Sequence, residues 1–107
     1  MKLNITCHQI NMTPSIEEHI QNKFKKINNH FKNVIDVKFT LTVEKKIHIA
    51  ESTINLPKNN IHAEAKDSDM YHAIELLINK LDKQVIKYKE KNSNHHQHES
   101  LKIKKGN

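Results

Sequence analysis

The chain has 107 residues and a formal net charge of +6, with a pI near 9.4; it contains 18 lysines and no arginine. This length predicts one domain with a modest core. The charge favours an anionic partner, of which nucleic acid is the commonest, although a lysine-rich surface also serves solubility alone. The single cysteine, Cys7, excludes an internal disulfide framework and fits a reducing compartment.

No stretch of the sequence resembles a signal peptide or is apolar for long enough to span a bilayer. We therefore expect a cytoplasmic protein without a membrane partner. The sequence also contains no glycine-rich phosphate loop and no paired-cysteine zinc motif, which disfavours two large classes of enzyme and metalloprotein.

The first part of the chain predicts a strand followed by a helix. Residues 2–7 alternate between apolar and polar side chains, as a half-buried strand does, so that Cys7 is best explained as a small core residue. Thr13 and Pro14 then form a helix start signal, and the helix should extend over residues 14–32. Its apolar face consists of Ile16, Ile20, Phe24, Ile27 and Phe31. A polar stripe beside this face consists of His19, Lys23, Lys26 and His30.

The middle of the chain predicts two longer strands. Residues 35–43 alternate without interruption. Their core-facing side chains are Ile35, Val37, Phe39, Leu41 and Val43. Residues 47–56 form the second of these strands, but which face of its first half is buried is ambiguous, because Ile47 and Ile49 point opposite to the apolar side chains that end the strand. A bulge or an edge position would reconcile the two halves.

A short fourth strand and a long helix complete the ordered part. After a turn at residues 57–60, residues 61–66 alternate again. Residues 69–91 follow helical spacing, with Ser68 or Asp69 able to cap the start. The apolar face of this helix consists of Met70, Ile74, Leu77, Ile78, Leu81, Val85 and Tyr88, bordered by Ala73. A stripe of lysines lies beside it: Lys80, Lys83, Lys87 and Lys91.

We expect residues 1–91 to form the domain and residues 92–107 to be a disordered, basic, histidine-rich tail, because the apolar period stops there. The element order β-α-β-β-β-α predicts an α+β fold. A right-handed β-α-β unit makes the first two strands parallel, so the four-stranded sheet is mixed and both helices lie parallel on one face. This topology gathers the lysines of both helical C-terminal halves: Lys23, Lys25, Lys26, Lys80, Lys83, Lys87 and Lys91.

The gathered lysines favour phosphate contacts that read the shape of RNA rather than its sequence, and a merely solvated helix face is the alternative. No arrangement of side chains suggests catalysis, a cofactor or a small-molecule substrate. His95, His96 and His98 of the tail would hold a metal only weakly, because a disordered tail does not preorganise a site. The sequence leaves two roles open for Tyr71, packing at the start of the helix and a contact with RNA.

Four stretches carry a family resemblance: M-K-L-N-I-T, T-P-S-I-E-E-H-I, V-E-K-K-I-H and, most specifically, D-M-Y-H-A-I-E-L-L-I-N-K-L-D-K-Q. Together they resemble the bacterial ribosome hibernation promoting factors, the family that includes ribosome-associated inhibitor protein Y. The resemblance covers residues 1–91 and implies a fold similar to double-stranded-RNA-binding domains. It also implies binding to rRNA of the small ribosomal subunit, in the channel used by mRNA and tRNA, so that translation stops in stationary phase.

Carried over residue by residue, the resemblance implies an rRNA-binding set of Lys23, Lys26, Lys80, Lys83 and Lys87, with Lys91 extending the stripe and Tyr71 near the rRNA. Relatives often carry an arginine in the second helix, whereas Lys83 offers a point charge in place of a bidentate fork. We expect no C-terminal dimerisation domain of the kind that long-form factors carry, and the tail is basic. The chain therefore looks closer to the short promoting factor, although T-I-N-L-P resembles protein Y.

We expect a non-enzymatic translation inhibitor that acts by steric occlusion, is monomeric in free solution and favours ribosome dimers. One alternative is a protein Y-type inhibitor that stabilises single inactive ribosomes. Others are a general double-stranded-RNA-binding module and a protein-interaction adaptor whose lysines are only solvated.

Overall fold

The computed structural model describes residues 2–101, and for residues 92–101 it describes the backbone alone. The elements are β1 (Lys2–His8), α1 (Pro14–His30), β2 (Asp36–Glu44), β3 (Ile47–Leu56), β4 (Asn59–Asp67) and α2 (Met70–Leu101). This order confirms the predicted α+β fold with its β-α-β-β-β-α sequence of elements.

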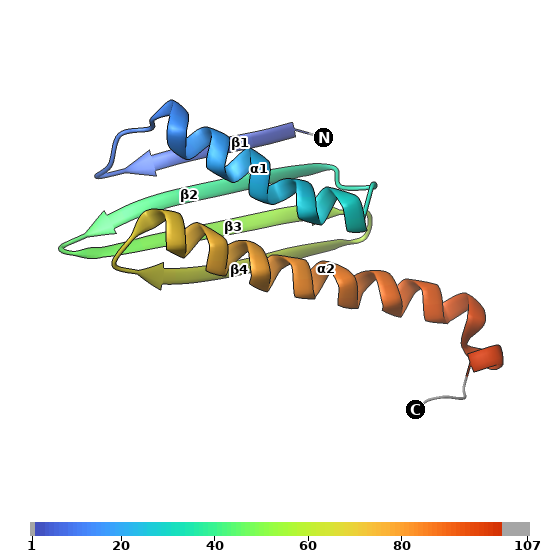
Figure 1. Cartoon of the computed structure of the whole chain (residues 1–107). Helices are drawn as coiled ribbons and strands as arrows, with labels where there is room; N and C mark the ends of the chain where they lie inside the picture. The colour runs from blue at the N-terminus through green and yellow to red at the C-terminus, as the bar shows by residue number, and fades with distance from the viewer. Residues whose placement is uncertain (1, 102–107) are drawn as a thin grey trace.

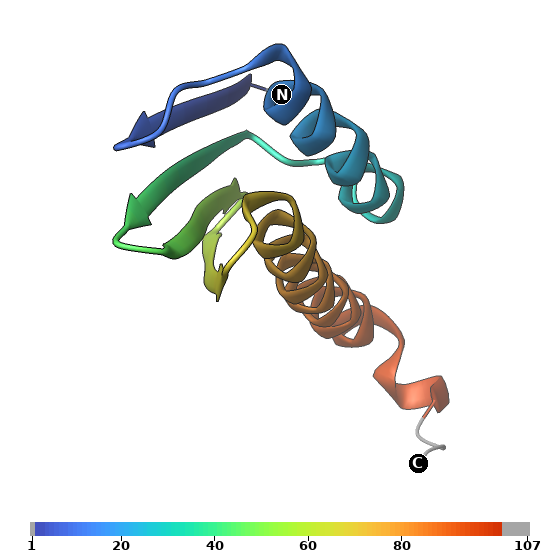
Figure 2. The same cartoon turned by 60° about the vertical axis from the view of Figure 1, so that its left-hand side comes forward.

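The four strands form one sheet in the order β1-β2-β3-β4. β1 runs parallel to β2, and the β2–β3 and β3–β4 pairs are antiparallel, which confirms the mixed sheet. Both helices lie on one face of the sheet and run in the same direction, whereas no described element covers the other face (Figures 1 and 2). The predicted pair of parallel helices is thereby confirmed, and the likeness to double-stranded-RNA-binding domains stays a prediction.

Side-chain caps set the start of each helix. The Oγ1 atom of Thr13 accepts a hydrogen bond from the amide of Ile16 at 3.1 Å, and Pro14 is the first helical residue. The Oδ2 atom of Asp69 accepts from the amide of His72 at 3.2 Å, so Asp69 rather than Ser68 caps α2.

The helices end at other residues than expected. α1 ends at His30 instead of residue 32, and its cap residue Phe31 is extended, with its amide bonded to the carbonyl of Ile27. α2 continues beyond the expected boundary at residue 91. The backbone of the expected disordered tail is therefore helical as far as Leu101, and residues 102–107 lie outside the described part of the chain.

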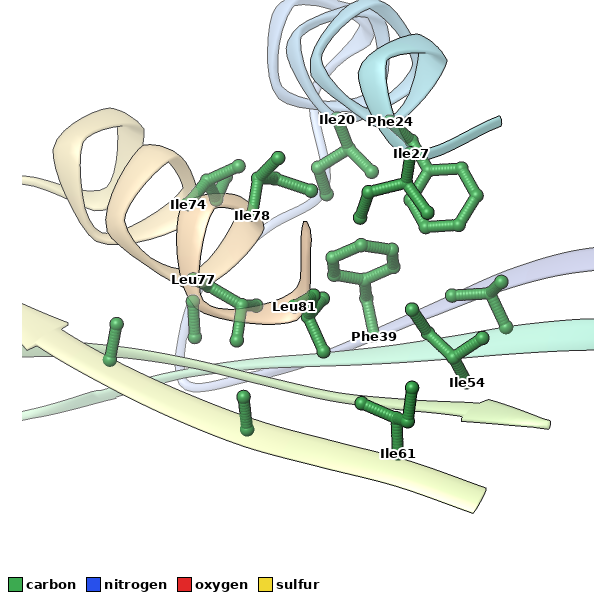
Figure 3. Packing of buried hydrophobic residues seen from close by; sticks show 14 of the residues in the cluster. Ile20, Phe24, Ile27, Phe39, Ile54, Ile61, Ile74, Leu77, Ile78 and Leu81 are labelled. Atoms are coloured by element: carbon green, nitrogen blue, oxygen red, sulfur yellow. The ribbon is translucent and has the colours of Figure 1, made fainter. Parts of the chain in front are cut away.

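The core lies between the sheet and the two helices (Figure 3). Phe24 of α1 and Phe39 of β2 meet there edge to face, with ring centroids 6.1 Å apart. Ala63 and Ala65 are buried side chains of β4 and leave room for α2 to lie close to the sheet. The helical contributions drawn in Figure 3 are Ile20, Phe24, Ile27, Ile74, Leu77, Ile78 and Leu81.

Two predictions about the strands are wrong. Ile35 is 56% exposed, because β2 begins only at Asp36 and Val34 takes the buried position before it. β3 has neither a bulge nor an edge position: it lies between β2 and β4 with uninterrupted pairing to both. Its core-facing positions include the small residues Ala50 and Ser52, whereas Ile47 and Ile49 belong to the uncovered face. The strand predicted over residues 47–56 is thus confirmed, and the outward pair of isoleucines is compatible with regular pairing.

Candidate nucleic-acid interface

Polar side chains connect α1 and α2 along their whole line of contact, which we call the seam. The contacts join residues at matching levels of the two helices, as parallel packing requires. The paired residues are Ser15 with Tyr71, Lys23 with Glu75, Lys26 with Asn79, and His30 with Asp82. The C-terminal half of α1 thus lies beside residues 75–82, in the first half of α2, so these contacts do not confirm the predicted proximity of the two C-terminal halves.

Tyr71 fastens the first turn of α2 onto α1. Its hydroxyl donates a hydrogen bond to Oγ of Ser15 at 3.0 Å, and its carbonyl oxygen accepts from Nε2 of His19 at 3.3 Å. The rings of Tyr71 and His19 also meet edge to face, with centroids 5.0 Å apart. Tyr71 thus has a packing role, and since it is 36% exposed, it is also reachable from solvent.

The two predicted lysines of α1 lie in the seam close to polar groups of α2. The Nζ atom of Lys23 is 3.7 Å from Oε2 of Glu75, and that of Lys26 donates to Oδ1 of Asn79 at 3.0 Å. Both lysine side chains remain about half exposed, at 45% and 52%. A hydrogen bond holds the ammonium group of Lys26 in place, and carboxylates of α2 partly compensate the charge of both lysines.

Asp82 closes the far end of the seam. Its Oδ1 atom accepts a hydrogen bond from Nδ1 of His30 at 2.7 Å, and its Oδ2 atom is 4.0 Å from Nζ of Lys26. The Asp82 side chain is only 8% exposed, whereas that of Glu75 is 44% exposed. Sequence reasoning missed Asp82 and Asn79, although an acid that borders the apolar face next to Ile78 was a usable signal.

A second row of cations, which we call the outer flank, consists of Lys80, Lys83, Lys87 and Lys91; all are exposed. On this side of α2 the helix faces the edge strand β4. Nζ of Lys80 donates to the carbonyl oxygen of Glu64 at 2.7 Å, and Nε2 of Gln84 donates to that of His62 at 3.1 Å. The predicted lysines are therefore arranged as two rows on the helical face: the seam and the outer flank.

The two rows differ in their acidic neighbours. Lys23 and Lys26 of the seam each lie within 4.0 Å of a carboxylate oxygen. Among the residues whose side chains are described, no ion pair involves a lysine of the outer flank. The outer flank consequently presents the less compensated charge to a phosphate backbone.

Two ionisable groups outside both rows have shifted pKa values. Burial raises the pKa of the Cys7 thiol, which keeps it protonated and unreactive, as expected of a core residue. Desolvation works against ionisation of Asp67, yet hydrogen bonds from the Asp69 amide and from His72 lower the pKa of this carboxyl. Cys7 belongs to β1 and Asp67 is the last residue of β4, so neither group is part of the lysine rows.

Within the described residues, no cluster of three or more histidine, cysteine, aspartate or glutamate side chains could hold a metal ion. His95, His96 and His98 lie among the residues whose side chains are not described. None of the helices in the described part of the chain is long and apolar enough to cross a membrane.

Residues 3–93 match the model of the family described as sigma 54 modulation protein / S30EA ribosomal protein. The chain belongs to this family. The ribosome hibernation promoting factor of Salmonella typhimurium is 39% identical over 95 residues, which cover 89% of this chain and 100% of that protein. The resemblance that the sequence motifs indicated is confirmed.

Solved structures agree with this membership in the S30EA family. A ribosomal subunit interface protein from Coxiella burnetii superposes with a TM-score of 0.79 at 27% identity, covering 83% of this chain and 98% of that one. The N-terminal domain of Thermus thermophilus protein Y superposes with a TM-score of 0.77 at 22% identity, covering 82% of this chain and 99% of that one. This match supports the fold alone. The mixed sheet with two helices is thus a shape found in other solved proteins.

Proposed function

We propose that this protein is a ribosome hibernation factor that acts in the cytoplasm and has no enzymatic step. Its helical face binds rRNA of the small ribosomal subunit in the channel for mRNA and tRNA, and the bound domain blocks translation by occupying that channel. Family membership and the name of the Salmonella relative support hibernation as the function. The ribosome-binding domain comprises residues 1–91, in line with the family match over residues 3–93.

The observation that carries the proposal is the outer flank. Lys80, Lys83 and Lys87 are exposed, lie on one helix and have no acidic partner among the described side chains. Each lysine that neutralises a phosphate releases counterions, so affinity should fall steeply as salt rises. Lys23 and Lys26 add charge whose position the seam defines, and Tyr71 is near enough to solvent to touch RNA.

The test is co-sedimentation of the purified protein with isolated small and large ribosomal subunits at low and moderate salt. We expect the wild type to bind the small subunit in a salt-sensitive manner and the Lys80→Glu/Lys83→Glu/Lys87→Glu variant to lose binding. A matched control, Lys38→Glu/Lys46→Glu/Lys66→Glu, makes the same change of charge at exposed residues of the sheet and its hairpin. Equal losses in both variants would argue for net charge alone and against the helical face.

A general double-stranded-RNA-binding module is the competing function, since lysine–phosphate contacts do not read sequence. Competition separates the two: a generic RNA duplex at equal phosphate concentration should displace the protein from small subunits only weakly. Displacement as effective as that by unlabelled small subunits would favour the general module.

We also propose that the protein favours pairing of ribosomes. The support is the basic tail, which resembles the short promoting factor more than protein Y, together with the Salmonella relative at 39% identity, which is named a ribosome hibernation promoting factor. Sucrose gradients of starved cells should show fewer ribosome dimers after deletion of the gene. More dimers after deletion would instead indicate a protein Y-type inhibitor of pairing.

A further inference from the structure

Asp82 is a carboxylate that lies almost entirely inside a protein of net positive charge. Residue Asp82 is 5% exposed and borders the apolar face of α2, next to the fully packed Ile78. Placing a charge there is costly, and exchanging a buried ion pair for apolar side chains is often neutral or stabilising. Stability alone therefore gives no reason for an aspartate at this position.

The carboxylate of Asp82 holds two side chains of α1. His30, the last residue of that helix, donates to it at 2.7 Å, and Lys26 lies 4.0 Å away with its Nζ also bound to Asn79. Both side chains are still open to solvent, at 41% for His30 and 52% for Lys26. The end of α1 is thus tied to the middle of α2 through groups that a phosphate could reach.

We propose that Asp82 is a positioning residue of the RNA interface: it fixes Lys26 and His30 relative to the lysines of α2. This inference rests on the proposed function of the helical face. Fixing these side chains before binding removes an entropy cost that mobile side chains would meet on the RNA. Asp82 does not itself contact the phosphates, because its charge has the wrong sign.

The proposal predicts an effect opposite in sign to simple charge counting. Removing an acid from a basic face should tighten RNA binding if only net charge matters. If Asp82 positions Lys26 and His30, Asp82→Leu should weaken binding to isolated small subunits by about fivefold. Asp82→Asn, which keeps a hydrogen-bond acceptor but no charge, should lie between Asp82→Leu and the wild type.

Glu75→Gln is the matched control. It removes one acid from the same seam, but Glu75 is 44% exposed and approaches Lys23 and His19 no closer than 3.7 Å. This variant should follow charge counting and bind at least as tightly as the wild type. Urea denaturation of each variant establishes that the fold is intact. Because His30 and Lys26 are open to solvent, Asp82→Leu leaves no buried charge without a partner, and we expect no loss of stability.

A double-mutant cycle gives a readout that a merely structural role would not move. His30→Ala should weaken binding, and adding it to Asp82→Leu should cause no further loss, because the two residues act through one contact. Additive losses, or binding of both Asp82 variants as tight as that of the wild type, would overturn the inference. If the wild-type protein does not bind small subunits, the proposed function fails and the inference fails with it.

Discussion

Lys80 reaches from α2 to the edge of the sheet, where its Nζ atom donates a hydrogen bond to the carbonyl oxygen of Glu64 at 2.7 Å. Gln84 makes the same kind of contact with His62, and the hydroxyl of Tyr88 donates to the carbonyl of Pro57. Three side chains of α2 thereby satisfy carbonyl groups of β4 and the turn before it. Such cover protects an edge strand from pairing with other chains.

Lys80 and Lys83 should therefore differ in their effect on stability. Lys80→Met leaves the Glu64 carbonyl without its donor and should lower the free energy of unfolding by about 1 kcal/mol. Lys83→Met removes an exposed side chain and should change it little. Urea denaturation measures both, and equal effects would show that the contact of Lys80 contributes nothing.

The same two variants should behave alike toward RNA. If each lysine neutralises one phosphate, each substitution to methionine should reduce the slope of log affinity against log salt by about 1. Titration of small subunits at several salt concentrations gives that slope. An unchanged slope for Lys83→Met would remove this residue from the interface.

The helix caps should each contribute measurably to the fold. Thr13→Ala and Asp69→Ala remove the oxygen that accepts from Ile16 and His72, and each should cost about 1 kcal/mol of stability. Ser68→Ala is the control, because Ser68 is exposed and does not cap α2. A loss at Ser68 as large as that at Asp69 would contradict the cap assignment.

Phe39 should be the most sensitive position of the sheet. It is 1% exposed and packs on Phe24, so Phe39→Ala should cost about 3 to 5 kcal/mol through lost contacts and a cavity. Small domains have only about 5 to 15 kcal/mol of stability in total. The near-ultraviolet circular dichroism of this variant should consequently show partial unfolding at 37 °C; a native spectrum and an unchanged urea midpoint would contradict the assignment.

The lowered pKa of Asp67 predicts how the stability of the protein depends on pH. The pKa of its carboxyl is lowered in the folded state from its ordinary value of 3.8, so its ionised form favours folding. This contribution to stability is present at pH values above 3.8, the ordinary pKa of the group in the unfolded chain. It is lost as the pH falls through the lower pKa of the folded state. The stability difference between wild type and Asp67→Asn should be constant near neutral pH and shrink in acid. A difference that grows in acid would show the opposite sign of shift.

Much of the fold was predictable because regular periods coincide with burial. The apolar residues of α1 and α2 recur at helical spacing, and Val37, Phe39 and Leu41 alternate, so element order and topology followed from pattern and chirality. The bounds of β3 were predicted correctly, but its expected bulge or edge position was wrong, because Ala50 and Ser52 face the core while Ile47 and Ile49 face outward. The hydroxyl of Ser52 is satisfied by the carbonyl of Lys38, a partner that no local pattern reveals.

The lysines of the candidate site were predictable as exposed stripes, but their partners were not. Whether Lys26 faces Asn79 and Asp82 depends on the register of two helices that are far apart in the sequence. Likewise, the contact of Lys80 with Glu64 depends on how closely α2 lies to β4. The spacing of side chains within one helix does not reveal which residues of other elements they contact. The division into seam and outer flank therefore emerged only from the structure.

The parallel pairing of β1 has a consequence for the order of folding. β2, β3 and β4 are joined by tight hairpins, whereas β1 meets β2 only after the chain has passed through α1, pairing Lys2 with Asp36. Because such a distant pairing requires a large loop to close, β1 should dock late, with φ-values near zero. β1 would then leave the ribosome before the other three strands and yet be the last of the four to join the sheet.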